Sequence, residues 1–114
     1  MKYMMFVVAD PVAAAEAVPS ENDLTIEQWR AEVEARGKRI AGDALRPVSE
    51  AVTVRVSRGQ VLVTDGPFSE TKEWIAGFDI LECEDLDEAI AIAARHPQAN
   101  GGKLELRPFQ TDGD

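Results

Sequence analysis

Two acidic side chains are the residues of this sequence best placed to do chemistry. Asp79 interrupts an apolar run, where a carboxylate costs free energy unless it is paired or exposed. Asp65 opens a Gly-Pro turn. Each can act as a catalytic base or bind a ligand. The alternatives are that Asp65 bonds to its own backbone in the turn, and that Asp79 is solvated or pairs with Arg55 or Lys103.

Four further residues are candidates for ligand binding. Phe68 and Trp74 follow the turn and can form the walls of a small apolar pocket, or else cover a sheet edge or a dimer interface. Lys72 has acidic neighbours and can hold an anion, or simply be solvated. Asp43 follows a glycine in a predicted loop and can join the site from across the sheet.

Cysteine and histidine are too rare for a metal centre. The chain has one cysteine, Cys83, and one histidine, His96. Neither a zinc site nor an internal disulfide is expected, and a single thiol is typical of the reducing cytoplasm. We predict no metal, no cofactor and a cytoplasmic location. His96 precedes Pro97 at a helix end, where the helix dipole favours the charged imidazole, so we interpret His96 as a structural cap.

Length and composition predict one soluble domain over residues 1–110, followed by a frayed tail at 111–114. The chain has 114 residues, of which 45% are hydrophobic and 29% charged. No apolar run is long enough to span a membrane, and the run in residues 1–8 is too short for a secretory signal. The net charge of −9 argues against nucleic acid as a partner. Residues 65–88 hold nine acids and one base, which suits either solubility or contact with a basic protein.

Hydrophobic patterns predict the elements of the first half. Residues 3–8 are apolar on both alternating faces, which indicates a central strand. Residues 12–18 suit a short helical turn, residues 38–41 a short strand, and residues 42–47 a loop.

The first clear helix begins near Thr25. Thr25 and Gln28 have the spacing of a capping box, and Gly37 ends the helix. Outward positions carry charged residues, Arg30 among them. The buried stripe is predicted to be Ile26, Trp29 and Val33.

A β-hairpin follows, and its register can be derived from the sequence. If Arg58 and Gly59 form a two-residue turn, Val56 lies opposite Val61 and Val54 opposite Val63. All the valines then share one face, which we predict to be buried.

The last part of the chain repeats the strand and helix pattern. Residues 75–83 form a strand on which Asp79 shares a face with Leu81. Asp85 begins the second helix, Pro97 ends it, and residues 103–107 form an edge strand. The helix stripe is predicted to be Leu86, Ala89, Ile90 and Ala93.

This order of elements predicts an α+β fold, the ferredoxin-like split βαβ plan with an added hairpin. Two helices cover one face of an antiparallel sheet. No third helix is predicted for the other face, yet Tyr3, Met5 and Val7, or their alternates, make it apolar. A second copy packed sheet to sheet would cover it, so we predict a homodimer.

The segment Asp65-Gly66-Pro67-Phe68, followed by Ser69 to Glu73, resembles the signature of the DGPF proteins, a branch of the YCII-related superfamily. The resemblance extends over nearly the whole chain and implies a dimeric α+β barrel of ferredoxin-like type. Some members of the superfamily pair a histidine with an aspartate in a cleft; here the histidine, His96, lies late in the chain. The other similar segments are residues 1–4, 42–45, 61–64, 77–78, 86–89 and 105–108.

Two hypotheses follow. The first is a small homodimer with a cleft that binds or transforms a small organic molecule, with Asp79 or Asp65 as base. The second is a non-catalytic regulatory module whose acidic segment contacts a basic protein. The resemblance implies a link to extracytoplasmic-function sigma factors, because DGPF proteins tend to be encoded beside them.

Overall fold

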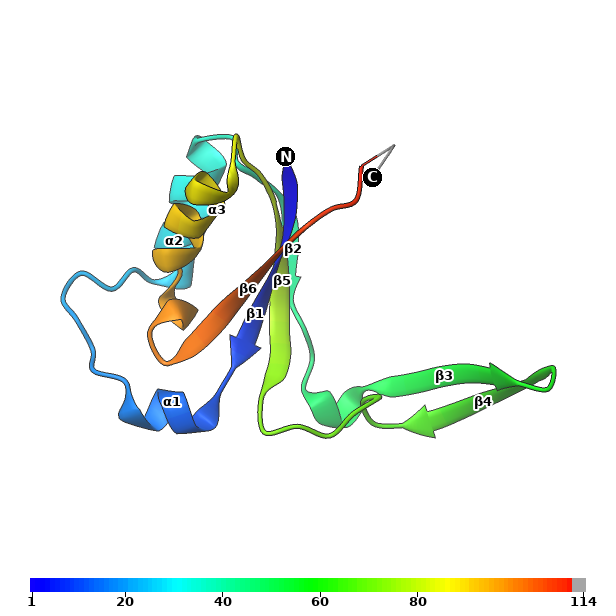
Figure 1. The fold of residues 1–114 in the computed structure, drawn as a ribbon. Coiled ribbons are helices and arrows are strands. Elements are labelled where there is room, and N and C mark those ends of the chain that lie inside the picture. The colour runs from blue at the N-terminus through cyan, green and yellow to red at the C-terminus, as the bar shows by residue number, and fades with distance from the viewer. Residues whose placement is uncertain (112–114) are drawn as a thin grey trace.

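Four antiparallel strands form the sheet on which the structure is built (Figure 1). They lie in the order β2-β5-β1-β6. The computed structural model describes residues 1–111, so the tail expected at 111–114 falls outside the described residues except for Thr111. The α+β prediction is confirmed, and the strand order is compatible with a ferredoxin-like plan. The bounds are Lys2–Ala9 for β1, Arg39–Ala44 for β2, Trp74–Glu82 for β5 and Gly102–Pro108 for β6.

The helices begin where the sequence provides capping side chains. In α2 (Ile26–Ala35), Thr25 Oγ1 accepts a hydrogen bond from the Gln28 amide at 3.1 Å, and Gln28 Oε1 accepts one from the Thr25 amide at 2.9 Å. This is the predicted capping box. The Asp85 carboxylate caps α3 (Leu86–Ala94) as predicted. Shorter pieces are α1 (Pro11–Glu16), capped by Asp10, and the 3₁₀ turns η1 (Val48–Glu50) and η2 (Pro97–Ala99).

Both α2 and α3 lie on the same side of the sheet, and the core forms between them and the strands (Figure 1). The buried Trp29 ties the two helices together, because its indole Nε1 donates a hydrogen bond to the Ile92 carbonyl at 2.9 Å. The stripe predicted for the second helix was partly wrong. Ile92 is buried, whereas Leu86 and Ile90 are each half exposed. The core residues are Tyr3, Met5, Trp29, Val33, Leu81, Cys83, Ala89, Ile92 and Ala93.

Strand β2 is longer than predicted. The sequence indicated a strand over residues 38–41 followed by a loop, but β2 continues through Ala44. Gly42 pairs with Asp79 and Asp43 with Phe78 of β5. Asp43 is therefore a strand residue, because pairing with β5 extends an element that local sequence alone would end at a glycine.

The hairpin has the predicted register but not the predicted burial. Strands β3 (Val52–Ser57) and β4 (Gln60–Asp65) pair Val56 with Val61 and Val54 with Val63. Arg58 and Gly59 both have positive φ, at 50° and 77°, as a type I′ turn requires. However, the hairpin projects away from the sheet (Figure 1), and its valine face is exposed. Alternation shows which side chains share a face and says nothing of what covers that face.

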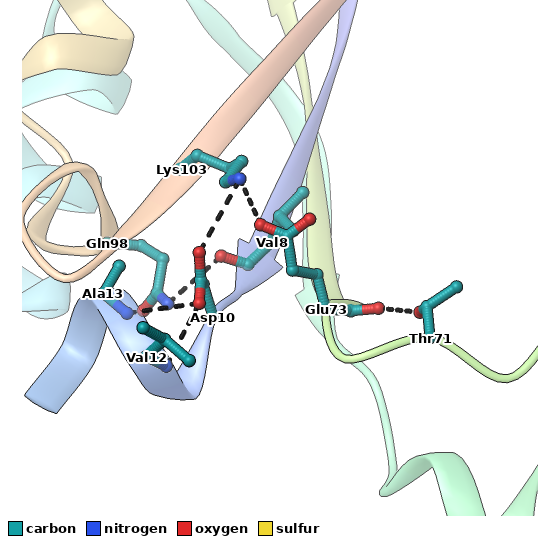
Figure 2. A network of polar contacts seen from close by, with 8 residues as sticks. All are labelled: Val8, Asp10, Val12, Ala13, Thr71, Glu73, Gln98 and Lys103. Atoms are coloured by element: carbon teal, nitrogen blue, oxygen red, sulfur yellow. Dashed lines mark hydrogen bonds and ion pairs between the residues drawn. The ribbon is translucent and has the colours of Figure 1, made fainter.

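A polar network joins the end of β1, the start of β6 and the segment just before β5 (Figure 2). Lys103 of β6 forms ion pairs with Glu73 and with Asp10, the latter at 3.7 Å. Gln98 of η2 donates a hydrogen bond from Nε2 to the Val8 carbonyl at 3.3 Å. These contacts hold the loop before β5 against the ends of β1 and β6.

The capping box of α2 gives a test of the local folding argument. Replacing Thr25 by Ala leaves the Gln28 amide without its acceptor, so we expect a loss of about 1 kcal/mol in the free energy of unfolding. Thr25→Ser keeps the hydroxyl and should lose much less. Urea denaturation of the three proteins measures both values, and an equal loss in the two variants would contradict the capping role.

Candidate functional site

A cavity of about 210 Å³ lies beside the sheet where β2 and β5 meet α2 and η2. It is the place where buried polar groups of the described residues come together. Its walls combine apolar side chains with one carboxylate, one guanidinium and one imidazole. The lining residues are Val7, Ile26, Arg30, Asp43, Ala44, Ala76, Gly77, Phe78, Asp79, His96, Pro97 and Gln98.

Asp79 is buried on the helix-covered face of β5, where only 5% of its surface is exposed. The Arg39 guanidinium donates a hydrogen bond from Nε to Asp79 Oδ1 at 2.7 Å and from Nη1 to Glu34 at 2.7 Å. Burial raises the pKa of Asp79 above its ordinary value, and Arg39 offsets part of that rise. The partner expected from the sequence, Arg55 or Lys103, was wrong. Edge strand β2 supplies Arg39 instead.

Gly42 makes this ion pair sterically possible. A Cβ atom at Gly42 would lie 2.5 Å from the Phe78 carbonyl oxygen, 2.9 Å from Arg39 Nη2, and closer still to Asp79 Oδ1. Only a residue without a side chain lets the β2 backbone approach the buried pair this closely.

His96 is buried at the junction of α3 and η2 and lines the same cavity, with 6% of its surface exposed. Its ring packs edge-on against Trp29, with centroids 4.7 Å apart. Its Nδ1 accepts a hydrogen bond from the Gln98 amide at 2.9 Å, so the neutral ring carries its proton on Nε2. Burial, with the nearby charge of Arg30, lowers the pKa of His96 to about 4.

The interpretation of His96 therefore changes. It does cap a turn, the 3₁₀ turn η2, as a side-chain acceptor. The charged form expected from the helix dipole is disfavoured, because losing water outweighs the attraction of the helix end.

Arg30 comes from α2 and was predicted to face outward with the other charged residues of the helix. It lines the cavity instead, and its Nε atom is buried without a hydrogen-bond partner. A buried guanidinium N–H without an acceptor is costly, and native structures contain few such groups. Arg30 is the polar group of this cavity that most needs a partner.

The residues singled out from the sequence divide between two places. Asp43 and Asp79 line the cavity, and Asp43 accepts a hydrogen bond at 2.9 Å from the next backbone amide. Asp65, Phe68, Lys72 and Trp74 are not among the lining residues. Phe68 is 90% exposed in the loop after the hairpin, and Trp74 is 39% exposed at the start of β5.

A second cavity, of about 340 Å³, lies on another side of His96 between the segment before α2 and the end of α3. Its cationic lining residue, Arg95, is already bonded to both carboxylate oxygens of Glu32 at 2.7 Å. This cavity therefore offers less unsatisfied charge than the one at Asp79.

Residues 1–111 contain no group of three or more His, Cys, Asp or Glu side chains that could hold a metal ion. Within the same range, no helix is long and apolar enough to cross a membrane.

Comparison with known proteins shows the family of the chain. The family model described as the YCII-related domain matches residues 1–110. The chain belongs to the YCII-related family. The resemblance noted at the DGPF segment is thereby confirmed. The chain is also similar to an uncharacterized protein of Rhizobium meliloti (strain 1021), with 45% identity over 67 residues. That match covers 57% of this chain and 54% of the relative, so it spans about half the length of each protein.

The buried neutral histidine of this YCII-related chain predicts a pH dependence of stability. In the unfolded chain His96 has its ordinary pKa of 6.5, whereas in the folded protein its pKa is about 4. Between these two pH values the unfolded state therefore binds a proton that the folded state does not. The contribution of His96 to the free energy of unfolding is therefore complete above pH 6.5 and falls by roughly 3 kcal/mol as the pH drops to 4.

Urea denaturation at several pH values measures this loss. His96→Asn keeps a side-chain acceptor for the Gln98 amide but cannot titrate, so its stability should be much flatter between pH 6.5 and 4. Both proteins retain Asp79, and the difference between them isolates the histidine. Parallel curves for the two proteins would show that His96 is not held neutral.

The ion pair at Asp79 gives a second prediction. Arg39→Met leaves the Asp79 carboxylate buried without its guanidinium, so we expect a loss of about 3–5 kcal/mol at pH 7. The deficit should shrink at acidic pH, because the pKa of Asp79 is already raised and protonation removes the buried charge. Arg46→Met, at an exposed pair with Glu50, is the control and should cost less than about 0.5 kcal/mol. Equal losses at both positions would contradict the account.

Proposed function

We propose that this YCII-related protein binds a small organic anion, such as a monocarboxylate, in the cavity formed by Arg30, Asp79 and His96. The observation that carries the proposal is the buried Nε of Arg30, which has no hydrogen-bond partner in the cavity wall. A guanidinium presents a planar pair of donors that matches a carboxylate. Bound carboxylate would satisfy Arg30.

The charges around the cavity support an anion rather than a cation. Arg39 is shared at 2.7 Å between Asp79 and the more exposed Glu34, which is not a lining residue, and His96 is neutral at physiological pH. The remaining charges in the wall are the partly buried cation Arg30 and the Asp43 carboxylate, which lies at an exposed position. His96 adds a second donor through its protonated Nε2.

The size and walls of the cavity support a small, partly apolar molecule. A volume of about 210 Å³ lies below the range of about 300–1,000 Å³ found for drug-sized ligands. Val7 and Ile26 supply apolar walls. Any proton transfer on the bound molecule would fall to Asp79 and His96, the two lining groups whose pKa values are shifted.

We infer in addition that the protein is a homodimer in the cytoplasm. The face of the sheet opposite the helices carries apolar side chains with no layer of this chain over them, and a second copy packed sheet to sheet would cover them. The free thiol of Cys83, which is buried, supports a reducing compartment. A monomer of 12.5 kDa in sedimentation equilibrium would overturn the homodimer. These apolar outer-face residues are Met4, Phe6, Val8, Phe78 and Ile80.

The alternative function, an acidic contact surface linked to sigma-factor regulation, has weaker support. Four of the nine acids in residues 65–88 form ion pairs within the chain, and Asp79 is buried. The acids therefore do not act as one free patch.

Titration with benzoate, followed by two-dimensional NMR, tests the anion site, with benzamide as the uncharged counterpart. Benzoate should shift the Trp29 indole signal, because that ring packs on His96 in the cavity wall. Arg30→Gln should weaken benzoate binding at least tenfold. Arg36→Gln removes a charge from the exposed end of the same helix and should change the dissociation constant for benzoate less than twofold.

Two results would overturn the proposal. One is equal binding of benzoate by the wild type and Arg30→Gln. The other is benzoate and benzamide binding equally well, which would show that the cavity does not select negative charge.

A further inference from the structure

The two oxygens of the Asp79 carboxylate lie in different environments. Oδ1 faces β2, where it accepts a hydrogen bond from Arg39 Nε at 2.7 Å and where a side chain at Gly42 would collide with it. Oδ2 accepts no hydrogen bond from the described residues. Because each oxygen of an ionised carboxylate is an acceptor, Asp79 keeps an acceptor that the protein does not use.

This second oxygen can be reached from the cavity. Among the described residues, the fully buried side-chain polar atom without a partner is Arg30 Nε. Asp79 Oδ2 also lacks a partner, so it is not fully buried, and the cavity that Asp79 lines is where it remains accessible. The same reasoning applies to His96 Nε2, which has no partner among the described residues and carries the proton of the neutral ring.

The cavity wall therefore combines two donors with one acceptor. Arg30 and His96 offer N–H groups, and Asp79 offers Oδ2. Sites for small molecules are mostly apolar and orient the ligand through a few polar groups of this kind. A ligand that satisfies all three groups carries a carboxylate for the two donors and a hydrogen-bond donor of its own for Asp79.

The charges near Asp79 favour a neutral donor over an ammonium group. Burial raises the pKa of Asp79, and the positive charges of Arg39 and Arg30 act against that rise, which places both guanidinium groups near the carboxylate. An ammonium group on the ligand would be a third cation in a site with little water. A hydroxyl group donates a hydrogen bond to Oδ2 without adding charge.

We propose that the ligand of this cavity is a small hydroxycarboxylate, whose carboxylate binds Arg30 and whose hydroxyl group donates a hydrogen bond to Asp79 Oδ2. The inference rests on the proposed anion site and adds the second polar group of the ligand. Asp79 is then the residue that determines specificity. An analogue without the hydroxyl leaves Oδ2 unpaired in a site with little water, and sites built to bind a hydroxyl discriminate strongly against such analogues.

Titration of the wild-type protein at pH 7, followed by two-dimensional NMR, tests the hydroxyl. The ligands are meta- and para-hydroxybenzoate, each compared with the fluorobenzoate that carries fluorine at the same position. Fluorine is small and cannot donate a hydrogen bond, and the two positions sample two distances between carboxylate and hydroxyl. The better hydroxybenzoate should bind about tenfold more tightly than its fluoro counterpart, or more. Equal dissociation constants within both pairs would overturn the proposal.

Two variants test whether Asp79 is the acceptor. In Asp79→Asn the Arg39 N–H holds the amide oxygen, which leaves the amide NH₂, a donor, towards the cavity. The preference for hydroxyl over fluorine should then fall below about twofold. Glu34→Gln alters the other partner of Arg39, outside the cavity wall, and should keep the preference. A preference that persists in Asp79→Asn would assign the hydroxyl to another lining acceptor, Gln98 or Asp43, and would overturn the proposal.

Failure of this inference and failure of the anion site give different results. If no benzoate binds, or if binding does not depend on Arg30, both proposals are overturned. If benzoate binds through Arg30 but the hydroxyl brings no preference, the anion site is retained and the hydroxycarboxylate alone is overturned. The comparison of hydroxybenzoates with fluorobenzoates needs only the wild type, so it remains decisive even if Asp79→Asn does not fold.

Discussion

The structure depends on Trp29, the largest buried side chain and the point where core and cavity meet. Its indole N–H is satisfied by the Ile92 carbonyl, so α2 and α3 are fixed relative to one another. The same ring packs against His96 and holds the imidazole in a dry environment. Because α2 is fixed in this way, Arg30, one residue further along the helix, is held at the cavity wall. One hydrogen-bonded aromatic ring thus connects the folding of the helices to the polarity of the site.

The polarity of the cavity comes from three ionisable groups in different environments. Asp79 is buried with a strong partner, His96 is buried without its charge, and Arg30 is partly buried with one N–H lacking an acceptor. Each of them loses hydration on burial. The ion pair with Arg39 compensates Asp79, and loss of the proton compensates His96, whereas nothing within the described residues accepts a hydrogen bond from the Arg30 Nε. This asymmetry is why the cavity is suited to an added anion.

Local features could be predicted from the sequence because they depend on neighbours in the chain. The capping box at Thr25 and the register set by Arg58 and Gly59 are of this kind, and both are confirmed. Asp79 was recognised because a carboxylate in an apolar strand is conspicuous. Its partner Arg39 was missed because it lies 40 residues away, on a strand whose register shifts just after it.

The remaining errors concern which faces of an element are covered by other parts of the structure. Arg30 looked exposed because charged helix positions usually are, and only the tertiary structure places it in the wall of a cavity that residues of β5 and η2 also line. The valine face of the hairpin looked buried because five valines on one face suggest a core. It is uncovered in the single chain, as is the outer face of the sheet. The proposed homodimer covers the outer face of the sheet.

The most direct measurement of the central claim is a crystal structure of the protein with benzoate. The account predicts one carboxylate in the cavity within hydrogen-bond distance of the Arg30 guanidinium, with the Arg39–Asp79 pair intact beside it. Benzoate bound elsewhere while this cavity stays unoccupied, or Arg30 turned out to solvent, would contradict it.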